Sequence, residues 1–281
     1  MARRPGDKSV PGAGHTSSRS AASDLQIALN AARAGAAAVA SGLRQPTKVS
    51  FKAEADPVTE VDHRSERAIL DLLTVHRGRD PVVSEEWGGS LPGSGRVWLV
   101  DPLDGTTNFI HGFPWMGVSV ALWIDDAPTV GVVVDVINGD EYTAVAGAGA
   151  RVNGTPIVVS TVKNFDEALV TTGFPYDRGQ RVEICDTRFR RVLAAAQGIR
   201  RLGAASLDMC MVACGRMDGY WEEDLSPWDM GAATLLVMEA GGTVTNQFGE
   251  PVGASDPFVV ASNGSIHHSF IETLRDTAPS S

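Results

Sequence analysis

The chain has 281 residues, of which 43% are hydrophobic, and a formal net charge of -10 at pH 7. This size and apolar content suffice for a large core, built as one α/β unit or as two tightly joined halves. The acidic balance, with no aromatic residues interleaved among basic ones, argues against nucleic acid as the primary ligand. No uninterrupted apolar run is long enough to span a bilayer.

Residues 1–22 are rich in arginine, proline, glycine and serine, which predicts a disordered, mildly basic tail. No apolar segment follows the first arginines, so we expect no secretory signal and a cytoplasmic protein. The three cysteines, Cys185, Cys210 and Cys214, cannot form a full disulfide framework, which agrees with a reducing compartment.

Residues 23–153 are predicted to form helices followed by an antiparallel sheet. An alanine-rich helix is expected at 24–43, and a second helix begins near Thr59, the expected N-cap, with Asp62 three residues later. Apolar or β-branched runs between turn residues predict strands at 82–84, 96–100, 118–124, 129–136 and 141–146.

Residues 154–281 are predicted to alternate strands and helices. Ser226 is the expected N-cap of a helix with proline at N1 and Asp229 at N3, and glycines end that helix. His267 and His268 are expected on the surface of a terminal helix. The remaining elements are strands at 168–172 and 219–222 and helices at 182–196 and 206–215, so the fold class is α/β (α+β).

The segment Asp101–Phe109 places two carboxylates three positions apart where an apolar strand stops. Asp101 falls at the strand exit, where ligands gather in α/β proteins. Asp104 stands where the N-cap of a following helix belongs, which leaves the backbone amides of Gly105 and Thr106 able to bind anionic oxygens. This pattern suits metal-assisted phosphate chemistry, although an isolated Asp-x-x-Asp-Gly also fits an ordinary capped turn.

Three further acidic motifs accompany this segment, namely Asp56–Asp62, Ser84-Glu85-Glu86 and Ser226–Asp229. Taken singly, the aspartates fit helix caps and the paired glutamates fit solvated acids. Capping does not explain why the motifs occur together, in one order and with one spacing.

The four motifs resemble those of the inositol monophosphatase family, within a larger group of lithium-sensitive, magnesium-dependent phosphatases that includes fructose-1,6-bisphosphatases. The segments Thr172–Tyr176 and Arg201–Asp208 also look like the family, and the similarity spans about residues 25–274. The resemblance implies an alternating αβαβα layered sandwich of the inositol monophosphatase / fructose-1,6-bisphosphatase type. It also implies a single phosphatase domain over residues 23–281.

The resemblance further implies two Mg²⁺ ions, and a third that binds more weakly near Glu85. Glu85, Asp101 and the backbone carbonyl of Leu103 would hold one ion, and Asp101, Asp104 and Asp229 would hold the second. Hard oxygen ligands of this kind suit Mg²⁺. Two ions about 3.5–4 Å apart serve an in-line displacement at phosphorus.

The catalytic residues implied by the resemblance are Asp62, Thr106 and Glu85. Asp62 and Thr106 would orient and deprotonate the attacking water, and Gly105 and Thr106 would bind the phosphate. Hydrolysis would then proceed by in-line attack of a metal-activated water, without a covalent enzyme intermediate.

On the alcohol side, the resemblance implies contacts from Asp104, from the backbone of Gly203, Ala204 and Ala205, and from Glu222. Ala204 stands where many members carry Ser or Thr, so a hydroxyl contact is absent. A carboxylate at position 222 suits a neutral polyol, whereas a basic residue there would suit a second phosphate. The expected substrate is inositol monophosphate, with histidinol phosphate, fructose 1,6-bisphosphate and 3'-phosphoadenosine 5'-phosphate as alternatives.

The resemblance implies a homodimer, because family members commonly form one. It also opens a non-catalytic alternative, since some bacterial relatives are accessory factors in transcription complexes. Five arginines lie close together in the sequence, at positions 188, 190, 191, 200 and 201, and fit either a basic face for a partner or, as is more common, solvated helix surfaces and subunit contacts. The intact acidic set favours an enzyme, because a pure binding module has no need of it.

Overall fold

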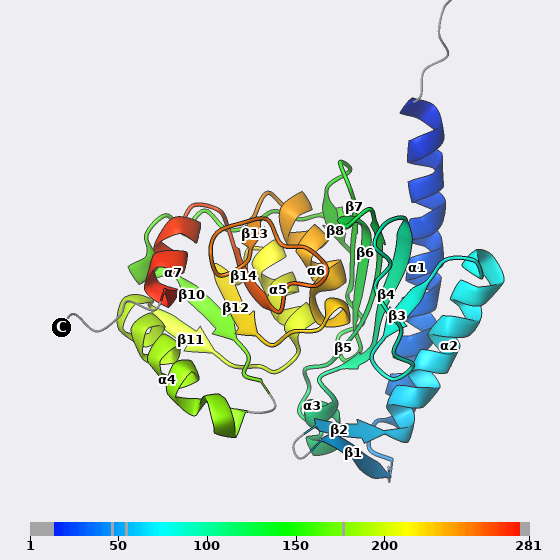
Figure 1. Cartoon of the computed structure of the whole chain (residues 1–281), viewed down its shortest axis with the longest axis horizontal. Coiled ribbons are helices and arrows are strands. Elements are labelled where there is room, and N and C mark those ends of the chain that lie inside the picture. The colour runs from blue at the N-terminus through cyan, green and yellow to red at the C-terminus, as the bar shows by residue number, and fades with distance from the viewer. Residues whose placement is uncertain (1–13, 46–47, 54–55, 176–177, 276–281) are drawn as a thin grey trace, which may run out of the picture.

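The computed structural model describes residues 14–45, 48–53, 56–175 and 178–275, which fold into five layers in the order αβαβα (Figure 1). Helices α1 (Gly14–Gly42) and α2 (Glu60–Arg77) pack on one face of a seven-stranded sheet. Helices α5 (Ala205–Ala213) and α6 (Pro227–Glu239) lie between that sheet and a five-stranded one. Helices α4 (Arg178–Ala195) and α7 (His267–Leu274) cover the outer face of the second sheet, which confirms the predicted sandwich.

The seven-stranded sheet is antiparallel except at one edge, where β3 (Val82–Ser84) runs parallel to β4 (Arg96–Asp104). It therefore confirms the predicted antiparallel sheet from β4 onward. A separate hairpin of β1 (Val49–Ala53) and β2 (Asp56–Thr59) lies near the short helix α3 (Thr106–His111). The strand order is β3 (Val82–Ser84), β4 (Arg96–Asp104), β5 (Gly117–Ile124), β6 (Ala127–Asp135), β7 (Glu141–Val145), β8 (Ala150–Val152) and β9 (Thr155–Pro156).

The five-stranded sheet mixes parallel and antiparallel pairs, and its strands alternate with helices along the chain as predicted, except between β13 and β14. A 3₁₀ turn, η1 (Phe165–Glu167), precedes its first strand. The strand order is β11 (Gly198–Arg200), β10 (Leu169–Thr172), β12 (Gly219–Glu223), β14 (Phe258–Ser262) and β13 (Thr243–Thr245).

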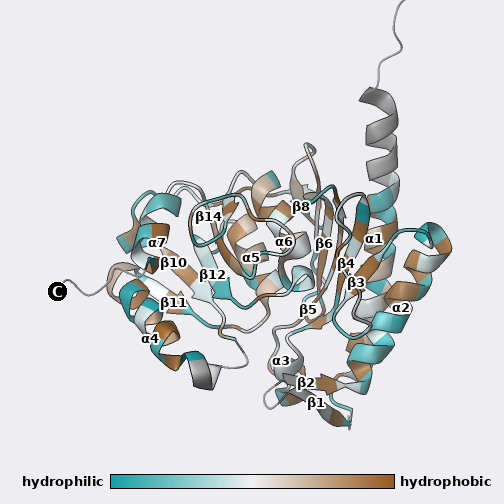
Figure 2. Cartoon of the chain, viewed as in Figure 1, coloured by the Kyte–Doolittle hydropathy of each residue, from teal (hydrophilic) through white to brown (hydrophobic). Residues whose placement is uncertain are grey.

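The central helices have apolar residues on all sides because both of their faces pack against a sheet. Every residue of α5 is buried. The outer helices α2 and α4 carry hydrophilic segments that face solvent (Figure 2). Strand β6 approaches α6 closely at Gly131, since a Cβ added there would lie 2.5 Å from the carbonyl oxygen of Ala232. One apolar cluster contains residues of both large sheets and of α5 and α6, so these layers share a core.

Two predicted boundaries were wrong. Helix α1 begins at Gly14, so residues 14–22 of the expected tail are helical; alanine favours a helix and no proline interrupts this stretch. The rest of the expected tail, residues 1–13, lies outside the described residues. Strand β4 continues to Asp104 through an irregular pairing after Asp101, and such irregularities accommodate proline.

His267 is buried, not exposed as predicted, whereas His268 is on the surface. The two ring nitrogens of His267 hydrogen-bond with the hydroxyls of Ser262 at 2.8 Å and Thr245 at 2.9 Å. Burial lowers the pKa of His267 to about 4. None of the described helices is long and apolar enough to cross a membrane.

Candidate active site

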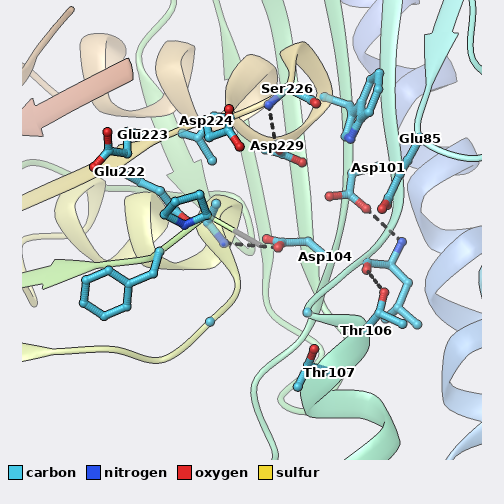
Figure 3. A pocket seen from close by; sticks show the side chains of 18 of the residues that line it. Glu85, Asp101, Asp104, Thr106, Thr107, Glu222, Glu223, Asp224, Ser226 and Asp229 are labelled. Carbon is cyan, nitrogen blue, oxygen red and sulfur yellow. Dashed lines mark hydrogen bonds between the residues drawn. The ribbon is translucent and has the colours of Figure 1, made fainter. Parts of the chain in front are cut away.

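A cavity of about 450 Å³ lies between the two halves of the described chain. Such a volume falls in the usual range for a small-molecule site. Glu85, Asp101, Asp104 and Asp229 face one part of it, and Glu222 lies with its acidic neighbours in another part (Figure 3). The lining residues are Glu85, Asp101, Leu103, Asp104, Gly105, Thr106, Thr107, Phe174, Pro175, Arg201, Gly203, Ala205, Glu222, Glu223, Asp224, Leu225, Ser226, Trp228 and Asp229.

Asp101 reaches the cavity from β4, where one of its carboxylate oxygens accepts a hydrogen bond from the Leu103 amide at 3.0 Å. Burial raises the pKa of Asp101 well above its ordinary range, and the negative charges of Glu85, Asp104 and Asp229 raise it further. Acids from β4, from α6 and from the turn after β3 therefore interact electrostatically in one place.

Asp229 enters the cavity from the first turn of α6. Its carboxylate accepts a hydrogen bond from the Ser226 amide at 2.7 Å, which completes the predicted capping box. Burial, and then the charge of Glu85, raise the pKa of Asp229 well above its ordinary range. The capping bond fixes this side chain at the cavity wall and is compatible with metal binding by the same carboxylate.

Asp104 caps α5, whereas we predicted that it would cap the helix that follows it. Helix α3 has Gly105 as its N-cap, in a left-handed conformation with φ 96°. The Asp104 carboxylate instead accepts hydrogen bonds from the amides of Ala205 at 3.1 Å and Ser206 at 2.8 Å, and from the Ser206 hydroxyl at 2.5 Å. Burial raises the pKa of Asp104 to about 6, although these bonds oppose the shift.

Asp62 and Thr106 form the carboxylate-hydroxyl pair that the resemblance implied. The Thr106 hydroxyl lies 2.8 Å from one Asp62 oxygen and 3.1 Å from the carbonyl oxygen of Leu103. The other Asp62 oxygen accepts a hydrogen bond from the amide of Thr59, as the predicted capping box requires, and another from the Thr59 hydroxyl. Thr106 lines the cavity and Asp62 lies fully buried behind it.

Glu66 is a functional candidate that the sequence did not reveal. It is buried on α2, and one of its oxygens accepts hydrogen bonds from the Ser84 hydroxyl at 2.6 Å and from the amides of Glu86 at 3.1 Å and Trp87 at 2.8 Å. These bonds fasten the turn that presents Glu85 to the cavity. The spacing of Asp62, Glu66 and Ile69 places them on one face of a helix, and this spacing could have indicated from the sequence that Glu66 lies near Asp62.

Glu222 lines the cavity at the end of β12. Its carboxylate accepts a hydrogen bond from the hydroxyl of Tyr220. Both carboxylate oxygens lie 2.0 Å from the place that a Cβ on Gly173 would occupy, so only glycine leaves room for them. Burial raises the pKa of Glu222 to about 7. Gly203 and Ala205 also line the cavity, whereas the buried side chain of Ala204 does not.

The five neighbouring arginines do not form one basic face. Arg188 is buried and pairs with Glu223, and Arg190 pairs with Asp186 along α4. Arg201 lines the cavity, which the sequence did not reveal.

The donor set fits a hard divalent cation, because it consists of carboxylates and a carbonyl oxygen without thiol or imidazole. Within the described ranges, no three His, Cys, Asp or Glu side chains already form a cage for a metal ion. Buried acids that repel one another favour a divalent cation, because it offsets their negative charge.

The five-layer fold and its acid-lined cavity place the chain among layered α/β phosphatases. The sequence model of the inositol monophosphatase family matches residues 21–278. The chain is 39% identical to an inositol-1-monophosphatase of Synechocystis sp., covering 90% of this chain and 89% of that protein. It is also 39% identical to the Nus factor SuhB of Pseudomonas aeruginosa, with 92% and 97% covered.

Among solved structures, an inositol monophosphatase from Anabaena (Nostoc) superposes with a TM-score of 0.83 at 36% identity, covering 92% of this chain and 98% of that chain. The chain belongs to the inositol monophosphatase family. Members of this family are phosphatases that hydrolyse phosphoric monoesters.

Proposed function

We propose that the chain hydrolyses a small phosphate monoester in a Mg²⁺-dependent reaction, and that inositol monophosphate is its main substrate. The observation that carries this proposal is the single cavity onto which Glu85, Asp101, Asp104 and Asp229 converge from segments far apart in the sequence. The Synechocystis and Anabaena relatives, named as inositol monophosphatases, support the choice of substrate.

Two or three Mg²⁺ ions would be held by this acidic set. Glu85, Asp101 and the Leu103 carbonyl would hold one, and Asp101, Asp104 and Asp229 would hold another, with a weaker site near Glu85. Bound Mg²⁺ would polarise the phosphoryl group and lower the pKa of a water molecule. Inhibition by lithium is expected from the same resemblance.

The chain's own residues would then position the water and the phosphate. Asp62 fixes the Thr106 hydroxyl, and both together would orient the attacking water and accept its proton. The amides of Gly105 and Thr106 lie at the start of α3 and would bind phosphate oxygens. On the alcohol side, Asp104, Glu222 and the backbone of residues 203–205 would accept or donate hydrogen bonds to hydroxyl groups.

A phosphate-release assay tests this proposal. The purified chain would be incubated with inositol monophosphate, histidinol phosphate, fructose 1,6-bisphosphate and 3'-phosphoadenosine 5'-phosphate, each with Mg²⁺ and with EDTA. We expect the fastest release from inositol monophosphate and none with EDTA. Preferred hydrolysis of another ester would correct the substrate, and release in EDTA would contradict the metal requirement.

A second candidate function is that of an accessory factor in a transcription complex, as the relatives named Nus factor favour. Binding to a transcription complex by a variant without phosphatase activity would support it. We also propose a homodimer, which light scattering would test, and a cytoplasmic location, which the free cysteines support.

A further inference from the structure

Arg201 is the basic residue among the described residues that line the cavity, facing an otherwise acidic wall. It follows β11 and precedes Gly203, whose backbone has φ +88°. A guanidinium in a cavity wall either forms an ion pair with a neighbouring acid or is available to bind a ligand, and its contacts show which of the two applies.

Two of the acids on the same side of the cavity, Glu223 and Asp224, already have arginine partners on α4. Arg188 lies 2.9 Å from a Glu223 oxygen, and both side chains are largely buried. Arg181 lies 3.3 Å from an Asp224 oxygen. The negative charges of Glu223 and Asp224 are thus offset by arginines. The part of the cavity wall that these two residues form is therefore less negative than the sequence implies.

Arg201 itself is exposed and forms no hydrogen bond or ion pair in the part of the chain that the structure describes. One of its terminal nitrogens lies 2.4 Å from the place that a Cβ on Gly203 would occupy, so the glycine makes room for the guanidinium. Burial raises the pKa of Glu222, and the positive charge of Arg201 opposes that rise. The two side chains are therefore close enough to interact electrostatically, although they form no salt bridge.

We propose that Arg201 is a specificity-determining residue that extends the range of substrates beyond inositol monophosphate, by binding a second acidic group, a carboxylate or a phosphate, on the alcohol portion of a further ester. This inference rests on the proposed function. Guanidinium binds carboxylate and phosphate through two parallel hydrogen bonds, which a lysine does not reproduce. Glu222 accepts a hydroxyl of the same alcohol, so besides inositol monophosphate the cavity accepts an ester whose alcohol carries both a hydroxyl and an anionic group.

The test compares two esters of similar size, glycerol 3-phosphate and 3-phosphoglycerate, in which a terminal hydroxymethyl group of the first is replaced by a carboxylate in the second. The kcat/KM for each is measured with the wild type, Arg201→Ala, Arg201→Lys and the control Arg200→Ala. Arg200 is exposed on β11, hydrogen-bonds to the Ile199 carbonyl, and does not line the cavity. Inhibition of inositol monophosphate hydrolysis by free glycerate gives a second readout.

We expect Arg201→Ala to lower kcat/KM for 3-phosphoglycerate by about 10- to 100-fold relative to glycerol 3-phosphate, as for loss of a hydrogen bond between charged groups. Arg201→Lys should retain part of the preference, Arg200→Ala should retain all of it, and inhibition by glycerate should weaken only in the Arg201 variants. An unchanged ratio, or an equal loss for both esters, would overturn the inference and leave the proposed function standing. Failure of the wild type to hydrolyse any ester would overturn both.

Discussion

Thr106 donates its hydroxyl to Asp62 at 2.8 Å, across 44 positions of the sequence. The same carboxylate caps α2 through Thr59. The start of α2 and the start of α3 are therefore joined at the cavity wall, and the proposed catalytic pair shares its carboxylate with a helix cap.

Replacement of Thr106 by alanine should lower kcat by about 100-fold or more, because the attacking water would lose its orienting hydroxyl. Thr106→Ser keeps the hydroxyl and should retain most of the activity. Steady-state phosphate release measures both variants, and circular dichroism checks the fold. Wild-type kcat in the alanine variant would show that the hydroxyl is not used.

Asp101→Asn should abolish nearly all activity and yet stabilise the protein in EDTA. Asp101 is a buried acid whose pKa is raised by burial and by neighbouring negative charges, so a neutral amide relieves repulsion in the metal-free state. Each kcal/mol gained should raise the melting temperature by about 2–4 °C. A lower melting temperature in EDTA would contradict this account of the acidic cluster.

The pH dependence of stability should carry a contribution from Glu222. The folded-state pKa is about 7 against an ordinary value of 4.5, so the folded protein binds this proton more tightly than the unfolded chain does. The free energy of unfolding in EDTA should therefore rise as the pH falls from about 8 toward about 4.5.

Glu222→Gln removes this contribution, and urea unfolding of both proteins across the same pH range measures the difference. His267 acts in the opposite direction, because its folded-state pKa is lowered to about 4 and stability falls as the pH drops below 6.5. That effect is present in both proteins and cancels in the comparison. Parallel curves for the two proteins would show that Glu222 does not titrate as described.

Glu66→Ala should weaken the apparent affinity for Mg²⁺ by about 10- to 100-fold, as loss of a partner that orients a ligand commonly does. The reason is that Glu66 fastens the turn carrying Glu85 through three hydrogen bonds to one oxygen. Glu66→Gln keeps an acceptor oxygen and should restore most of the affinity. The Mg²⁺ concentration for half-maximal activity is the readout, and a lower melting temperature with an unchanged Mg²⁺ requirement would limit Glu66 to a structural role.

Gly131→Ala should lower the free energy of unfolding by about 1–3 kcal/mol, because the new methyl group would lie 2.5 Å from the Ala232 carbonyl oxygen and overpack the contact between β6 and α6. Gly93→Ala is the matched control, since a Cβ there meets nothing within 4 Å. Urea unfolding compares the two variants. Equal free energies of unfolding for the two variants would mean that β6 and α6 move apart to accommodate the methyl group without loss of stability.

Local chemistry made part of the site predictable from the sequence. The capping boxes at Thr59 and Ser226 are set within three residues, so their aspartates were placed correctly. Asp104 was not, because its partners in α5 lie 101 and 102 positions away and local spacing favoured the adjacent helix. The position of Arg201 in the cavity wall was not predicted for a similar reason. Only the packing of β11 beside the cavity distinguishes this residue from a surface arginine.

The most direct test of the central claim is anomalous diffraction from crystals soaked with Mn²⁺ as a substitute for Mg²⁺. The account predicts anomalous peaks in the cavity, within bonding distance of carboxylate oxygens of Glu85, Asp101 and Asp229. A fully occupied Mn²⁺ site elsewhere, with none among these carboxylates, would contradict it.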